Sequence, residues 1–308
     1  MITELTTEAI EFGQQALRAF EAAGGDELVK RAEVDPDARA ALTDGVLADL
    51  GAWELEPRND VDSLEAAAAL CRSAGYWTLP YPVAERLSRT TDADGLVVVA
   101  ETRPAAAIRG VAATWAAVTV EGSRGTVTGL RGASPAFVAE LDLTPEDGDG
   151  TDDVALALVL PCWTLLGMLD RALHLTIAHV QSRHQFGQSL AGFQSVQFQL
   201  TDAEVERAGL EMLAKHALWS VGERTPSAVD DALALRMAAL EAAEVVFRVT
   251  HQLHGAVGFC DETTLSWLSR HSQPLRRLPF GLSATCDLLT RRIGPSGLTG
   301  LFSAEAAP

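Results

Sequence analysis

The sequence predicts a mainly helical protein that carries a small β domain in its middle. Apolar residues such as Ile10, Leu17 and Phe20 recur in threes and fours near the start of the chain, which is the spacing of an amphipathic helix. Short β-branched runs separated by Gly, Pro and Ser follow, and long helical runs occupy the remainder. We therefore expect three parts: an N-terminal helical domain over residues 1–90, a β domain over 91–150 and a C-terminal antiparallel helical bundle over 151–308.

The first two parts break into shorter elements. Further helices are expected at about 37–50 and 62–75, the second of which begins with an Asp/Ser cap and stops at a glycine. Four runs, LVVVAE, WAAVTVEG, GTVTGL and AFVAEL, predict a sheet of four or five strands. The stretch TPEDGDGTDD at 144–153 is acidic and contains glycine, so it is predicted to be a linker.

The C-terminal part is predicted to be a bundle of long helices. Short connections separate these helices, which favours antiparallel packing of neighbours. The expected helices cover about 153–182, 193–222, 226–258, 262–270 and 282–293.

Composition excludes several classes of protein. The net charge of -18 argues against nucleic acid as a partner, because phosphate binding needs clustered Lys and Arg. The longest apolar stretch, 154–169, is shorter than a bilayer span, and the acidic N-terminus does not resemble a secretory signal. The four cysteines form no CxxC pair, so neither a zinc site nor a disulfide framework is expected, and a reducing cytoplasm is the natural compartment.

Three sequence segments, in this order along the chain, resemble the acyl-CoA dehydrogenase family. The string GYWTLPYPVAE at 75–85 resembles a G-x-x-x-x-P-x-P-x-x-E element of bacterial members. The segment RHQFG at 183–187 leads into FQSVQ at 193–197, as in the family's R-x-x-F-G turn and F-Q-x-x-Q helix start. The segment QLHGAVGF at 252–259 is similar to the family's Q-x-x-G-G-x-G-[FY] segment, with Ala256 in place of the second glycine.

This resemblance implies that the chain binds FAD, a flavin dinucleotide held mainly by a neighbouring subunit. Arg183 would contact the pyrophosphate, Phe186 would pack on the dinucleotide, and Gln252 would hydrogen-bond its adenosine-pyrophosphate portion. Leu190 and Phe193 would line the same groove. The complete set of expected cofactor-binding residues is Arg183, Phe186, Gly187, Leu190, Phe193, Gln194, Gln252, Gly255 and Ala256.

The residue that performs proton abstraction in the family is missing here. Family members use a glutamate as a base on the acyl α-carbon while the flavin accepts the β-hydrogen as hydride. The usual position of this glutamate corresponds to Pro279 or Phe280, and the alternative position on the long helix before R-x-x-F-G corresponds to Ala157. The family's T-E-P-x-x-G-S-D segment is also replaced, by AETRPAAA at 100–107, and the β domain is shorter than the family's.

Three hypotheses about function follow. The preferred one is a non-catalytic, FAD-binding partner subunit, which joins a homologous base-bearing acyl-CoA dehydrogenase subunit in a hetero-oligomer and supports dehydrogenation of an acyl-CoA at a shared site, in sterol side-chain or fatty-acyl degradation. The second is a self-sufficient flavoenzyme with a relocated base, for which Asp287, Asp170 and His254 are the candidates. The third is a non-enzymatic assembly protein that binds no flavin. No metal site is expected, because the inward Glu-x-x-His pairs of metal-binding bundles are absent from the sequence.

Overall fold

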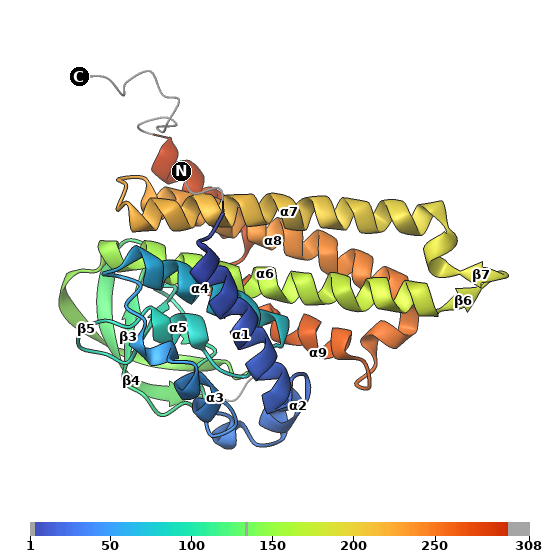
Figure 1. The fold of residues 1–308 in the computed structure, drawn as a ribbon. Helices are drawn as coiled ribbons and strands as arrows, with labels where there is room; N and C mark the ends of the chain where they lie inside the picture. Colours follow the sequence, from blue (N-terminus) through green and yellow to red (C-terminus); the bar gives the residue numbers. More distant parts are fainter. Residues whose placement is uncertain (1–3, 133–134, 295–308) are drawn as a thin grey trace.

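The computed structural model describes residues 4–132 and 135–294, and Figure 1 shows its fold. The predicted fold class is confirmed: helices dominate, and in chain order a small sheet follows the N-terminal helices and precedes the C-terminal bundle. The N-terminal elements are α1 (Thr7–Ala23), α2 (Glu27–Val34), the 3-10 helix η1 (Pro36–Ala38), α3 (Asp44–Asp49), η2 (Ala52–Glu54), α4 (Val61–Tyr76) and α5 (Val83–Leu87).

Among the described residues the sheet has five strands in the order β1-β3-β4-β5-β2, in which β1 and β3 pair in parallel and the other pairs are antiparallel. Its members are β1 (Gly95–Val98), β2 (Ala105–Ala106), β3 (Trp115–Val118), β4 (Ser123–Arg131) and β5 (Ala139–Asp149). The prediction of a linker from residue 144 was wrong, because β5 continues through the acidic stretch to Asp149. The physical reason is cross-strand pairing: Arg124 lies opposite Glu146, whose carboxylate also accepts a hydrogen bond from the Thr126 hydroxyl.

The C-terminal bundle is built on three long helices that lie side by side in Figure 1, and α7 runs opposite to its neighbours. These helices are α6 (Thr151–Ser182), α7 (Gln194–Gly222) and α8 (Ala228–His254). The third is shorter than predicted, because Gly255 adopts a φ of +64° and ends it, as glycine does at many helix ends. The remaining elements are β6 (His184–Gln185), β7 (Gln188–Ser189), η3 (Leu190–Gly192), η4 (Gly255–Phe259), α9 (Thr264–His271), α10 (Gln273–Arg277) and α11 (Leu282–Ile293).

Helix α6 is the central core element of the molecule. By length and composition it could cross a membrane, but 78% of its most apolar window is buried inside the protein. It packs against α4, α7 and α8, and Trp163 near its middle is fully buried. Its apolar character is therefore accounted for by its position in the core.

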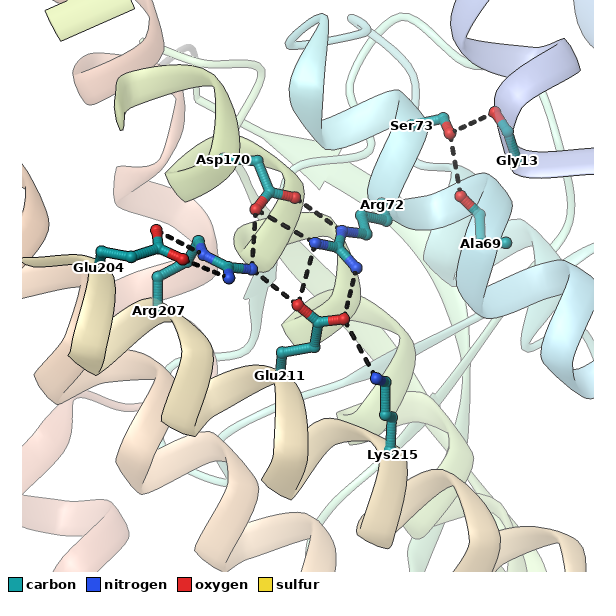
Figure 2. Close-up of polar contacts among 9 residues, drawn as sticks. All are labelled: Gly13, Ala69, Arg72, Ser73, Asp170, Glu204, Arg207, Glu211 and Lys215. Atoms are coloured by element: carbon teal, nitrogen blue, oxygen red, sulfur yellow. Dashed lines mark hydrogen bonds and ion pairs between the residues drawn. The ribbon is translucent and has the colours of Figure 1, made fainter. Parts of the chain in front are cut away.

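An ion-pair network joins the N-terminal helices to the bundle (Figure 2). Arg72 of α4 contacts Asp170 of α6 at 2.6 Å and Glu211 of α7 at 3.1 Å. Arg207 also reaches Glu211, at 2.7 Å, and Lys215 lies 3.3 Å from the same carboxylate. Burial alone would raise the pKa of Glu211, but the three cations outweigh it and lower that pKa to about 2.

Replacing Glu211 by Gln is expected to lower the free energy of unfolding by about 2 kcal/mol at neutral pH. The Glu211 pKa is depressed in the folded state, so its stabilising contribution is complete above its ordinary pKa of 4.5 and is lost as the pH falls toward about 2. Urea unfolding between pH 7 and pH 2 should therefore show a shallower acid dependence for the variant than for the unmodified protein.

Glu204→Gln provides the matched control. Glu204 pairs with Arg207 at 2.6 Å, but its side chain is 53% exposed, and exposed pairs contribute little to stability. Equal losses in the two variants would show that the buried position of Glu211 is irrelevant to its contribution.

Candidate functional site

The turn after α6 places the first group of predicted cofactor residues at one end of the bundle. Strands β6 and β7 form a two-residue hairpin whose turn is Phe186-Gly187, with φ values of +52° and +86°. Positive φ at both positions is the geometry of a type I′ turn, which is easy for glycine and strained for phenylalanine. Phe186 is 89% exposed, so the hairpin presents a large aromatic ring to solvent.

The residues around this hairpin are arranged in one continuous stretch. Arg183 caps the C-terminus of α6, is exposed, and its carbonyl accepts a hydrogen bond from the Leu190 N–H at 2.8 Å. Phe193 precedes α7 and packs edge-on against Phe186 at 6.2 Å. Gln194 begins α7 and is exposed.

The second predicted segment lies at the same end of the bundle, as Figure 1 shows. The rings of His179, in the last turn of α6, and His254, in the last turn of α8, stack at 4.3 Å. Gln252, Gly255 and Ala256 are exposed beside this contact. The structure thus brings together two segments that are separated by some sixty residues in sequence.

Sequence reasoning missed several residues at this end. His179 and His251 were assigned no role from the sequence, and His254 was considered only as a relocated base; His251 stacks on Phe259 at 4.4 Å. Burial lowers the pKa of all three histidines, so these rings favour the neutral form. The sequence feature that could have indicated this close packing of histidines is Gly258, because a Cβ there would meet the His254 Cβ at 2.9 Å.

The positions of the missing glutamate lie elsewhere, around an interior cavity of about 120 Å³ that is partly open to solvent. Ala157 of α6 and Pro279 both line this interior cavity, and Phe280 adjoins Pro279. The Arg236 guanidinium holds the Pro279 segment in place by donating to the carbonyl oxygens of Leu275, Leu278 and Phe280 at 3.2, 2.6 and 2.7 Å. A cavity of this volume is smaller than the 300–1,000 Å³ or so typical of pockets that enclose organic ligands.

The three candidates for a relocated base do not line the interior cavity. Asp287 is exposed on α11, Asp170 is engaged by Arg72 and Arg207, and His254 is hydrogen-bonded to the Thr250 carbonyl at 2.9 Å. Among the residues that line the cavity, the carboxylate is Glu85, whose pKa is raised by burial. Sequence reasoning quoted Glu85 within its motif but assigned it no role.

The structure contains no group of three or more His, Cys, Asp or Glu side chains placed to hold a metal ion, within residues 4–132 and 135–294.

Comparison with known proteins indicates the family to which this sequence is related. Residues 153–281 match the family model described as "Acyl-CoA dehydrogenase, C-terminal domain". The chain is 29% identical over 181 residues to acyl-CoA dehydrogenase FadE28 of Mycobacterium tuberculosis, covering 56% of this chain and 53% of that protein. The matched segment therefore spans about half the length of this curated relative.

Two solved structures share the fold over nearly the whole chain. The ChsE4-ChsE5 complex from Mycobacterium tuberculosis gives a TM-score of 0.76 at 17% identity, covering 97% of this chain and 100% of the other. A Tcur3481-Tcur3483 steroid ACAD variant gives a TM-score of 0.77 at 20% identity, covering 93% of this chain and 98% of the other. Residues 153–281 thus match the C-terminal domain of the acyl-CoA dehydrogenase family, and the resemblance predicted from the motifs is confirmed for this part of the chain.

Proposed function

We propose that this chain is the non-catalytic, FAD-binding partner subunit of a hetero-oligomeric acyl-CoA dehydrogenase. It would join a homologous subunit that carries the base, and the pair would support α,β-dehydrogenation of an acyl-CoA thioester in the cytoplasm. The observation that carries the proposal is that the residues predicted to bind flavin and the positions of the family base lie in two different places. Most of the residues predicted to contact flavin are exposed at one end of the bundle, whereas Ala157 and Pro279 occupy, at the interior cavity, positions where the family has its base.

The exposed end of the bundle fits a flavin dinucleotide. Arg183 offers a guanidinium for a pyrophosphate, and Gln252 offers an amide. A Cβ on Gly187 or Gly255 would meet nothing within 4 Å, so open space adjoins both backbone turns. FAD, when bound, supplies the hydride acceptor, while the residues of this chain bind and orient it.

An exposed apolar stripe supports a partner subunit. Phe198, Val205 and Met212 of α7 are 59%, 63% and 54% exposed, and their spacing of seven residues puts them on one face of the helix. Exposed apolar residues in such an arrangement mark surfaces that another protein covers. Phe186 and Phe259 extend the exposed apolar surface at the hairpin end.

The relatives suggest the substrate class. One similar structure is described as a complex of two named proteins, ChsE4 and ChsE5, and another as a steroid ACAD. By analogy we propose a bulky acyl-CoA, as in sterol side-chain degradation, with other fatty acyl-CoA thioesters as the alternative.

A second candidate function is a self-sufficient acyl-CoA dehydrogenase in which Glu85 is the base. Glu85 shares the interior cavity with both positions of the family glutamate, and this is the observation that favours it. The small volume of the cavity argues against it, because an acyl-CoA would have to open the site. A non-enzymatic assembly protein would instead bind no flavin with any partner.

The test of the proposal is the number of acyl-CoA sites in the purified complex. Titration calorimetry of the complex with a non-reactive acyl-CoA analogue should give about one site for each pair of unlike subunits. Two equivalent sites per pair would contradict the proposal, since this chain would then hold substrate in its own cavity.

Phe186→Asn separates the flavin role of this residue from any role in folding. Asparagine tolerates positive φ, so the variant is expected to keep its stability or gain about 1 kcal/mol from relief of backbone strain. The complex should nevertheless retain less FAD, because the exposed ring is lost. Thermal melting and the flavin absorbance of the same preparation report the two effects, and unchanged flavin content would remove Phe186 from the site.

A further inference from the structure

The interior cavity contains a buried arginine that the proposed function does not use. Arg39, which follows η1, is 1% exposed and lines the cavity. Its Nη2 donates to the Ala107 carbonyl at 3.0 Å, and the guanidinium lies over the Phe137 ring at 4.2 Å. Its Nε and Nη1 are buried and have no hydrogen-bond partner among the described residues.

Such an arginine carries a cost for folding. A buried donor without an acceptor loses its hydration and gains nothing in return, and this cost is greater for a charged group. Burial lowers the pKa of Arg39 to about 9, so the side chain still carries its charge at neutral pH. The Nε and Nη1 donors of Arg39 therefore lack an acceptor among the described residues, and a bound ligand could supply one.

Among the described residues no carboxylate pairs directly with Arg39, although the charge of nearby Glu85 partly offsets the lowering of the Arg39 pKa by burial. Glu85 also lines the cavity but makes no ion pair within 4.0 Å of Arg39. The Arg236 guanidinium adds a second buried positive charge and donates to backbone carbonyls rather than to a carboxylate. His271 also lines the cavity, but it is paired with Glu33 at 3.0 Å and therefore adds no unpaired charge. The lining thus has an excess of positive charge, which favours an anion.

The remaining walls fix the size and character of that anion. They are largely apolar, with Val97, Ala106, Ala157 and Met168 among the lining residues. A volume of about 120 Å³ suits a ligand of roughly five or six heavy atoms, by comparison with engineered cavities of similar size. A carboxylate at Arg39 followed by a short alkyl chain satisfies both the donors and the apolar walls.

We propose that the interior cavity binds a short-chain monocarboxylate, with its carboxylate on Nε and Nη1 of Arg39 and an alkyl chain of about two to four carbons against the apolar walls. This site is separate from the exposed hairpin end and does not depend on flavin or on a partner subunit. A matching neutral molecule would leave the arginine without its acceptor, and a long alkyl chain would extend beyond the apolar walls into solvent.

The experiment is thermal melting of the full chain with sodium propionate or butyrate, compared with propionamide, octanoate and sodium chloride at equal ionic strength. Propionate and butyrate at about 50 mM are expected to raise Tm by about 2 °C, whereas the other three additives have no such effect. Saturation-transfer NMR on the same samples should show contact with the alkyl protons of propionate. A shift that is equal for propionate and chloride, or for butyrate and octanoate, would overturn the proposal, as would no shift at all. The absence of any shift in Tm would mean that the cavity holds only water.

Two variants assign the effect to the cavity. Arg39→Gln should abolish the propionate shift. Arg86→Gln should keep it, because Arg86 also lies over an aromatic ring, Trp53 at 5.0 Å, but is absent from the cavity lining. If Arg39→Gln does not fold, the series of ligands on the unmodified chain still decides the question. Loss of the shift in both variants would contradict the assignment to Arg39.

Discussion

Replacing Gly167 by Ala is expected to destabilise the protein by about 3 kcal/mol and to lower Tm by about 5 °C. Gly167 of α6 faces α4 at the closest approach of the two helices, where an added Cβ would lie 1.8 Å from the Arg72 carbonyl oxygen. Gly75 of α4 makes the reciprocal contact, since its Cβ would lie 1.9 Å from the Thr164 carbonyl oxygen. Backbone atoms cannot rotate away as a side chain can, so the helices would have to separate.

Separation of α4 and α6 in Gly167→Ala would also disturb the ion-pair network between these helices. Arg72 lies at this crossing, and its contacts with Asp170 and Glu211 require the present spacing of α4 and α6. Differential scanning calorimetry measures the loss. Gly209→Ala is the matched control: Gly209 is also a helical glycine, but a Cβ there meets nothing within 4 Å, so alanine should stabilise α7 by about 0.5–1 kcal/mol. Equal effects of the two substitutions would contradict the close-packing argument.

Replacing Arg183 by Ala is expected to weaken FAD binding by the complex about 10- to 100-fold. Hydrogen bonds between charged groups contribute about 1.5–3 kcal/mol, and the pyrophosphate would lose its guanidinium partner. The stability of the chain should change little, because Arg183 is exposed and its structural contact to Leu190 uses the backbone carbonyl.

The measurement is the flavin content of the complex after gel filtration, together with FAD titration by fluorescence. Arg277→Ala serves as the control, since Arg277 is exposed on α10, away from the hairpin turn. Unchanged flavin affinity in Arg183→Ala would remove this residue from the site, and an equal loss in both variants would point to overall charge instead.

The sequence predicted the order of the elements because apolar spacing reflects burial directly. The long runs near 153–182 and 193–222 correspond closely to α6 and α7, since both helices bury apolar residues along their length. The end of α8 was misplaced because Gly255 belongs to a run that otherwise continues the helical pattern. The start of β5 falls within the predicted strand AFVAEL, but its acidic continuation from residue 144 to Asp149 was missed because pairing with β4 is what holds it.

The candidate site was predicted only where a local motif exists. Arg183 and Gln252 stand in motifs, but their proximity rests on the contact of His179 with His254, and neither histidine alone signals a site. The roles of Arg39 and Glu85 were not predictable, because they depend on elements from three parts of the chain meeting around one cavity. The absence of a base at Ala157 and at Pro279 or Phe280 followed from the family resemblance and needed no structure.

Anaerobic reduction of the flavin by acyl-CoA tests whether this chain lacks a base of its own and acts through a partner. The purified chain, supplied with FAD and kept without oxygen, is mixed with a panel of acyl-CoA thioesters while the flavin absorbance is followed. We expect no bleaching with the isolated chain, whether or not it retains flavin, and bleaching once the base-bearing subunit is present. Bleaching by the isolated chain would contradict the account and would make Glu85 the first residue to replace.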